Sequence, residues 1–173
     1  MLEEGDSRGD EHVARFGQDE LLEAYEGYKK TRERIDAGEL WWDQLREHFT
    51  PDAVFVDPAW GRVDGIDRIV KFLQDSMRGL EDWSFPLEWM AVDGDYLITG
   101  WQNRLPGRRA DGSYYQAPGM SRLRYAGEGK FDYEQDLINM LHMLEVMKES
   151  GWKPGEGFQN PPKDRTRLCA WEP

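Results

Sequence analysis

The order of hydrophobic patterns along the chain limits its fold more than any other feature of the sequence. Early in the chain, residues that share one side of a helix recur at helical spacing: Leu22, Tyr25, Tyr28, Arg32 and Ile35. Later, strand-like runs are separated by turns such as Asp93-Gly94-Asp95, because Asp-Gly tolerates the positive φ of a tight hairpin. Helices followed by an antiparallel meander predict an α+β fold, in which a curved sheet wraps around the early helices as a cone.

The predicted elements can be given as residue ranges. We expect helices at 19–38, at 40–49 and from 64 or 67 to 77. A strand at 53–58 should end at Pro58, which has no N–H to continue a ladder. Further strands are expected at 85–92, 96–105, 114–125 and 130–136, and a last helix at 137–150.

Side-chain patterns also predict how these helices begin and pack. Either Asp64 or Asp67 would cap the third helix. The apolar face of the second helix would consist of Trp41, Trp42, Leu45 and Phe49. The apolar face of the last helix would consist of Met140, Leu141, Leu144 and Met147.

One domain with two tails accounts for the chain of 173 residues. Residues 1–17 are polar and acidic and are expected to form a flexible tail, and residues 18–150 would form the cone. Residues 151–173 are rich in Gly and Pro and have no helical or strand period. Their aromatic side chains, such as Phe158, gain from burial, so we expect this tail to lie over the mouth of the cone or on a partner subunit.

Charge and composition argue against several classes of partner. The net charge of -12 disfavours nucleic acid and anionic membrane surfaces, which are bound through Lys and Arg. No apolar run is long enough to span a bilayer, and the acidic start of the chain lacks the features of a signal peptide. Cys169 is the only cysteine, so neither a disulfide nor a cysteine metal cluster is expected. A cytoplasmic protein is the expectation.

Three stretches resemble proteins of the nuclear transport factor 2-like superfamily. They are residues 36–40 (Asp-Ala-Gly-Glu-Leu), residues 49–65 with the step Asp57-Pro58, and residues 127–136. Within this superfamily the SnoaL-like group is the most similar. The resemblance implies a cone with an internal pocket, on a scaffold that serves isomerases, hydrolases, dehydratases, cyclases and plain binding proteins. It also implies a homodimer through the convex face of the sheet, where aromatics such as Trp89, Tyr125 and Tyr133 cannot all face the cone.

Asp57 is the first candidate catalytic residue. Ketosteroid isomerases carry their general base in an Asp-Pro step at this place, and a carboxylate at the rim of an apolar cone has a raised pKa. The alternative is that Asp57 caps the following turn. The two acid donors of the isomerases are not matched, because their positions fall near Thr31, with Tyr28 one turn earlier, and on Ser121. This mismatch argues against ketosteroid isomerisation itself.

Asp136 is the second candidate catalytic residue. Limonene epoxide hydrolases place a water-activating aspartate at the matching position on the last strand. Their arginine and second aspartate correspond here to Trp101 and Asn103, so the hydrolase triad is incomplete. Glu134 shares a strand face with Asp136, because side chains alternate along a strand. The alternative for both carboxylates is a solvated strand face or a cap for the last helix.

The predicted pocket lining comes from alternating positions on two neighbouring strands. Trp101 and Asn103 share one face, and Tyr115, Ala117, Gly119 and Ser121 share another. The small residues Ala117 and Gly119 would leave room for a ligand, or Gly119 would mark a bulge that bends the sheet. The expected ligand-binding residues are Tyr28, Trp60, Trp101, Asn103, Tyr115, Ser121 and Glu134.

Two classes of function remain open at this point. The first is cofactor-free acid/base catalysis, such as isomerisation, cyclisation or hydration, on a small apolar or polycyclic molecule. The second is a binding module that holds such a molecule without changing it, and epoxide hydrolysis is a further alternative. The chain shows no spacing of histidines and carboxylates typical of a metal site, so no metal or organic cofactor is expected.

Overall fold

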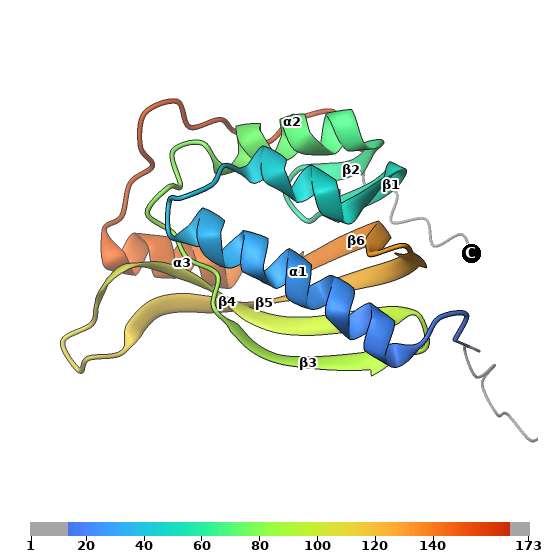
Figure 1. Ribbon diagram of the computed structural model, residues 1–173. Helices are drawn as coiled ribbons and strands as arrows, with labels where there is room; N and C mark the ends of the chain where they lie inside the picture. Colours follow the sequence, from blue (N-terminus) through green and yellow to red (C-terminus); the bar gives the residue numbers. More distant parts are fainter. Residues whose placement is uncertain (1–13, 167–173) are drawn as a thin grey trace, which may run out of the picture.

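The computed structural model describes residues 14–166 (Figure 1). The acidic segment 1–13 of the expected N-terminal tail lies outside the described residues, as does Cys169. The described part folds into the following elements: α1 (Gln18–Asp36), the 3₁₀ helix η1 (Trp42–His48), β1 (Phe49–Asp57), β2 (Gly61–Asp64), α2 (Ile66–Met77), β3 (Leu87–Asp93), β4 (Tyr96–Arg108), β5 (Tyr114–Gly127), β6 (Lys130–Ile138) and α3 (Met140–Ser150).

The strands form one six-stranded sheet in the order β2-β1-β6-β5-β4-β3. Strands β3 to β6 are an antiparallel meander, and β1 joins it by pairing parallel to β6. The sheet is curved and does not close; α1 lies along its inner face, α2 packs beside β1 and β2, and α3 packs against β4 and β5 (Figure 1). The α+β cone fold predicted from the order of the patterns is therefore confirmed.

Helix α1 agrees with its prediction at both ends. Its buried side includes Leu21, Tyr25, Tyr28 and Ile35, which lie at spacings of three, four and seven residues. The helix ends before Gly38, which adopts a φ of 73° that residues with a side chain rarely take.

The segment predicted as a second α-helix is instead the short 3₁₀ helix η1. Its buried residues Trp42 and Leu45 are three apart, which matches the three residues per turn of a 3₁₀ helix. Trp41 lies outside the helix with 43% of its surface exposed, and Phe49 already begins β1. The predicted apolar face of this helix is therefore wrong at both of its ends.

The predicted cap of α2 is also wrong. The N-cap position is Gly65, which has a φ of 86° and no side chain to accept a hydrogen bond. Asp64 and Asp67 are used elsewhere, since they pair with Arg62 and Arg46 at 2.7 and 2.8 Å.

Helix α3 packs on a different face from the predicted one. The chain stays in β6 until Ile138, and Asn139 then caps the helix by accepting a hydrogen bond from the backbone N–H of His142. Met143 and Val146 are buried, whereas Leu141 and Leu144 are 69% and 57% exposed. Because the first two residues of the predicted helix, Leu137 and Ile138, belong to the strand, the helix docks with another side turned to the sheet.

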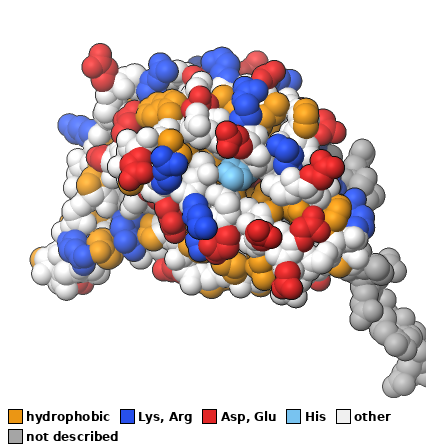
Figure 2. All heavy atoms as spheres, viewed as in Figure 1, with side chains coloured by type: hydrophobic (Ala, Val, Ile, Leu, Met, Phe, Trp, Pro, Cys, Tyr) orange, Lys and Arg blue, Asp and Glu red, His pale blue; other side chains and the backbone are white. Residues whose placement is uncertain are grey.

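The core has two parts. The larger one fills the space between α1, η1, α2 and the sheet, and a smaller one lies under α3, where Trp83, Leu105 and Ala117 meet Met143 and Val146. On the face drawn in Figure 2, acidic and basic side chains are interspersed. No helix within the described residues is long and apolar enough to cross a membrane.

Both ends of the described chain pack on the domain. Near the start, the side chain of Arg15 pairs with Asp95 at 2.5 Å, although it falls within the tail expected to be flexible. After α3, Trp152 packs against Trp83 with ring centroids 5.2 Å apart. Farther on, the carbonyl of Thr166 accepts a hydrogen bond from the backbone of β2. Residues 151–166 thus run back across the domain towards α2, as their aromatic content predicts (Figure 1).

Candidate active site

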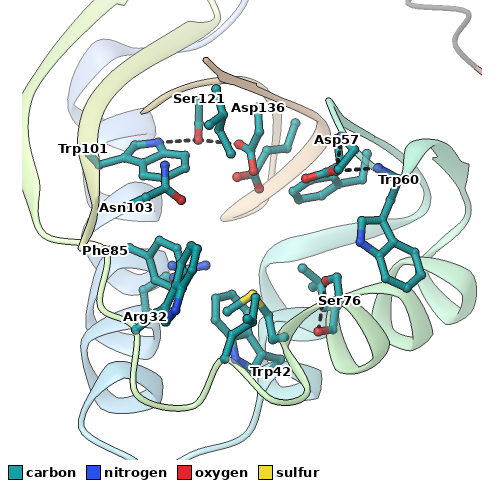
Figure 3. Close-up of a pocket in the computed structure, with 18 of the residues that line it drawn as sticks. Arg32, Trp42, Asp57, Trp60, Ser76, Phe85, Trp101, Asn103, Ser121 and Asp136 are labelled. Carbon is teal, nitrogen blue, oxygen red and sulfur yellow. Dashed lines mark hydrogen bonds between the residues drawn. The ribbon is translucent and has the colours of Figure 1, made fainter. Parts of the chain in front are cut away.

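A cavity of about 800 Å³ opens between α1, α2, α3 and the inner face of the sheet (Figure 3). Its size is within the range of small-molecule sites. Most of its lining is apolar and aromatic, with a small number of polar groups, as such sites usually have. The aromatic lining includes Tyr25, Trp42, Phe55, Trp60, Phe72, Trp83, Phe85 and Trp101.

Asp136 is held on one wall of the cavity by two residues of neighbouring strands. Its Oδ1 accepts a hydrogen bond of 2.6 Å from the hydroxyl of Ser121. The same hydroxyl oxygen accepts a bond of 2.8 Å from the indole N–H of Trp101 (Figure 3). An indole N–H can only donate, so the single proton of Ser121 is directed to Asp136. Oδ2 of Asp136 has no hydrogen-bond partner between residues 14 and 166 and is left for a molecule in the cavity.

The surroundings of Asp136 bring its titration close to neutral pH. Burial raises the pKa of Asp136 to about 7, against the opposing effect of the Ser121 hydrogen bond. The carboxylate of Asp57 raises this pKa further, and the charge of Arg32 lowers it. A carboxyl group with a pKa near the working pH can both accept and donate a proton, which is the property of a general acid/base.

Glu134 lies beside Asp136 and forms a buried pair with Tyr28. Its side chain is only 3% exposed, and both of its oxygens lie within 3.2 Å of the Tyr28 hydroxyl, which donates to them. Burial, with a smaller contribution from Asp136, holds the pKa of Glu134 well above its usual range. The alternative of a solvated strand face is therefore wrong for Glu134, and Asn139 caps α3 in place of either carboxylate.

Asp57 combines the two interpretations that the sequence leaves open. Its Oδ1 accepts hydrogen bonds of 2.7 Å from the backbone N–H groups of Ala59 and Trp60, so it does cap the turn. It also lines the cavity, one position beyond the registered pair Val56–Gln135 that joins β1 to β6. Burial raises the pKa of Asp57, and the two backbone N–H groups oppose that rise.

All but one of the predicted ligand-binding residues line the cavity. Those that do are Tyr28, Trp60, Trp101, Asn103, Ser121 and Glu134. Tyr115 does not, because it lies six positions, or about 20 Å of strand, before Ser121 on β5. Tyr115 packs against the smaller core, and the guanidinium of Arg109 lies 4.9 Å from its ring centre.

The small residues of β5 serve packing within the protein. Gly119 pairs with Trp101 across β4 and β5, and the indole of Trp101 lies over it. A Cβ at Gly119 would meet ring atoms of Trp101 at 2.6 to 2.8 Å. The register between β4 and β5 is regular at this pair, so the predicted bulge is wrong, and the space left by the glycine is filled by the tryptophan. Ala117 is likewise fully enclosed in the smaller core.

Several lining residues have no counterpart among the predicted site residues. Arg32 of α1 lines the cavity one turn after Tyr28, and Met140, Met143 and Phe158 contribute from α3 and the C-terminal segment. A charged residue within the otherwise apolar stripe of a helix is the signal that points to Arg32. Among residues 14–166, no group of three or more His, Cys, Asp or Glu side chains is placed to hold a metal ion.

Comparison with known proteins places the chain in a family. Residues 29–132 match the family model described as the SnoaL-like domain. The chain belongs to the SnoaL-like family. No curated protein matches it. The SnoaL-like match ends before Glu134 and Asp136, so the two carboxylates of the last strand lie just beyond it.

Solved structures share this SnoaL-like fold at low sequence identity. A protein named as a SnoaL-like polyketide cyclase from Jannaschia sp. CCS1 is 15% identical, with a TM-score of 0.57 over 82% of this chain and 96% of that one. An LEH-like epoxide hydrolase from M. tuberculosis is 16% identical, with a TM-score of 0.55 over 76% and 91%. A protein with a ketosteroid isomerase-like fold from Catenulispora acidiphila DSM 44928 is 17% identical, with a TM-score of 0.54 over 73% and 97%. At these identities the likeness concerns the fold alone.

Proposed function

We propose that this SnoaL-like protein binds a small apolar or polycyclic molecule in the cavity and moves a proton on it without a cofactor. One observation carries the proposal. Asp136 has one oxygen fixed by Ser121, its other oxygen open to the cavity, and a pKa of about 7. A carboxyl group so placed can exchange a proton with a bound molecule near neutral pH.

The proposed reaction consists of two proton transfers between Asp136 and the substrate. The ionised Asp136 takes a proton from a C–H or O–H group of the substrate on Oδ2, and the electron pair of the broken bond stays on the substrate. The acid then returns the proton to another atom of the substrate, which gives isomerisation or assists ring closure. The hydrogen bond from Ser121 stabilises the carboxylate form of Asp136. The indole N–H of Trp101 keeps the Ser121 hydroxyl directed at Asp136.

Two further residues fit supporting roles in this proposal. The side-chain amide of Asn103 is buried at the cavity and makes one long bond of 3.5 Å to the carbonyl of Ala117. Its amide oxygen remains available to a ligand, since no hydrogen bond within the described chain uses it. Asp57 keeps Oδ2 beside its capped Oδ1, and we assign it as the second acid/base group.

Proton transfer can be tested without knowing the natural substrate. The protein is incubated in D₂O with a panel of polycyclic enolisable ketones, and deuterium in each recovered compound is measured by mass spectrometry. We expect incorporation into at least one compound, reduced about a hundredfold or more by Asp136→Asn. Asp52→Asn, which changes an exposed carboxylate of β1, is the matched control and should behave as the parent.

The alternative function is a binding module, favoured by the absence of the isomerase and hydrolase donor sets at the matching positions. A compound that binds to the parent and is recovered without deuterium would support this alternative. Deuterium incorporation by Asp136→Asn at the parent rate would remove Asp136 from the mechanism.

A further inference from the structure

The cavity contains a cationic side chain whose hydrogen-bond donors the described protein leaves unused. Arg32 follows Tyr28 by one turn of α1, and Asp36 follows it by another, so all three project towards the cavity. The guanidinium of Arg32 lies over the rings of Trp42 and Phe85, at 4.1 and 5.1 Å from their centres. In Figure 3, Arg32, Trp42 and Phe85 lie across the cavity from Ser121 and Asp136.

Two neighbouring cations of α1 each have a carboxylate at ion-pair distance, whereas Arg32 acts on Asp36, Glu134 and Asp136 from farther away, where its charge lowers the pKa of each. Lys29, which also lines the cavity, pairs with Glu26 at 2.6 Å, and Arg34 pairs with Glu39 at 3.1 Å. Arg32 makes no ion pair or hydrogen bond with any described residue. The nearby Asp36 uses its carboxylate to accept the backbone N–H of Phe85 at 3.1 Å.

The N–H groups of Arg32 are available to an anionic oxygen of a ligand in the cavity. The guanidinium contacts the rings of Trp42 and Phe85, which are nearly perpendicular to each other at 86°, through cation–π interactions that use none of its N–H groups as hydrogen-bond donors to a described residue. The planar guanidinium presents N–H groups that match the two oxygens of a carboxylate. Because the side chain already packs on two rings, it loses less conformational entropy when such a pair forms.

The acidic residues of the cavity do not cancel this preference. Glu134 is shielded by its pair with Tyr28, and Asp57 has one oxygen bound by two backbone N–H groups. Burial favours the uncharged form of Glu134 and raises the pKa of Asp136 to about 7. Glu33 and Asp36 also line the cavity and disfavour an anion relative to a neutral ligand, so a preference for the anion would arise against their effect.

We propose that Arg32 binds an acidic oxygen substituent of the ligand, a carboxylate or a phenolate, and so turns the rest of that ligand towards Asp136. This inference rests on the proposed function only in that the ligand occupies the same cavity. It narrows the substrate class from apolar molecules in general to apolar ring systems that carry one acidic group. It makes Arg32 a residue that determines specificity, distinct from the acid/base groups on the opposite wall.

A pair of fluorescent probes that differ only in charge tests the proposal. Anthracene-2-carboxylate and the neutral anthracene-2-carboxamide are titrated into the full chain at pH 7.5, and binding is followed by probe fluorescence. The parent should prefer the carboxylate by about tenfold, as a charge-assisted pair provides. Arg32→Gln should reduce this ratio to about one or below, because the acidic lining then acts alone. Arg32→Lys, which keeps the charge without the planar fork, should give an intermediate ratio.

Controls separate this inference from folding and from catalysis. Arg34→Gln makes the same charge change on the exposed side of α1 and should keep the full preference. Asp136→Asn should reduce deuterium exchange about a hundredfold or more while leaving the preference for the carboxylate in place, so the two proposals can fail independently. Equal affinity of the parent for both probes, binding of neither, or an unchanged ratio in a folded Arg32→Gln would each overturn the role of Arg32.

Discussion

Replacing Asp136 by asparagine keeps the shape of the side chain and an acceptor for Ser121 but removes the ionisable group. In the folded protein burial raises the pKa of Asp136 from 3.8 to about 7, so the folded chain keeps this proton where the unfolded chain has lost it. A raised folded-state pKa contributes stability that is complete below about pH 4 and is lost as the pH rises through about 7. The Asp136→Asn variant should therefore gain stability relative to the parent across this window.

The expected gain in the free energy of unfolding follows from the size of the rise in the pKa of Asp136. A rise of about three pKa units corresponds to an upper limit of about 4 kcal/mol. Because the side chain is partly open to the cavity, solvent screening reduces this figure, and we expect about 2 kcal/mol. For a chain of this size that is a rise of about 4–8 °C in Tm. Removing Asp136 also removes one cause of the raised pKa of Glu134, which acts in the same direction.

Urea unfolding of both proteins at several pH values between about 4 and 9 measures the effect directly. The difference in free energy of unfolding should be smallest at the acid end, grow up to about pH 7 and then stay constant. Asp52→Asn, the exposed control, should show no such growth. A stability difference between Asp136→Asn and the parent that is the same at pH 4.5 and pH 8.5 would refute the burial argument.

Two further predictions concern packing and assembly. Gly119→Ala should destabilise the fold by about 1–3 kcal/mol in thermal or urea unfolding, because the new Cβ meets the indole of Trp101; a neutral effect would show that the ring moves freely. We also expect a homodimer through the outer face of the sheet, where Trp89 and Met120 flank Gly100 and are 46% and 39% exposed. Sedimentation at micromolar concentration should then give twice the monomer mass of 20.2 kDa, and the monomer mass would contradict it.

The sequence predicts the elements and their order well because local patterns determine them. The stripe that contains Tyr28 and the alternation that carries Asp136 are both read within a few residues. The sequence does not predict where along a strand the cavity ends. The strand alternation therefore places Tyr115 in the lining, although Tyr115 packs under Arg109. That limit depends on where α3 docks, and α3 docks with Met143 inward because the preceding strand runs farther than its pattern suggests.

Residues that act through distant contacts were the hardest to foresee. The raised pKa of Glu134 comes from its burial under α1 and from Asp136, while the hydrogen bond from Tyr28, more than a hundred positions away in sequence, opposes the rise. Arg32 looks like an ordinary helix residue until η1 and the segment before β3 supply the neighbouring Trp42 and Phe85. Of the three aromatics expected not all to face the cone, Trp89 is exposed, whereas Tyr125 and Tyr133 are buried.

The C-terminal segment adds a wall to the cavity that the sheet does not provide. Phe158 and the residues up to Pro161 line the cavity, and the backbone of Gly155 is tied to Gly79 at 2.8 Å. This wall is therefore built by a stretch that carries none of the acid/base groups and forms no strand of the sheet. Insertions, deletions or exchanges in it can reshape the space for a ligand while the carboxylates stay in position. For a protein engineer, residues 152–166 are an exchangeable part that could retune ligand choice while the carboxylates of the sheet stay unchanged.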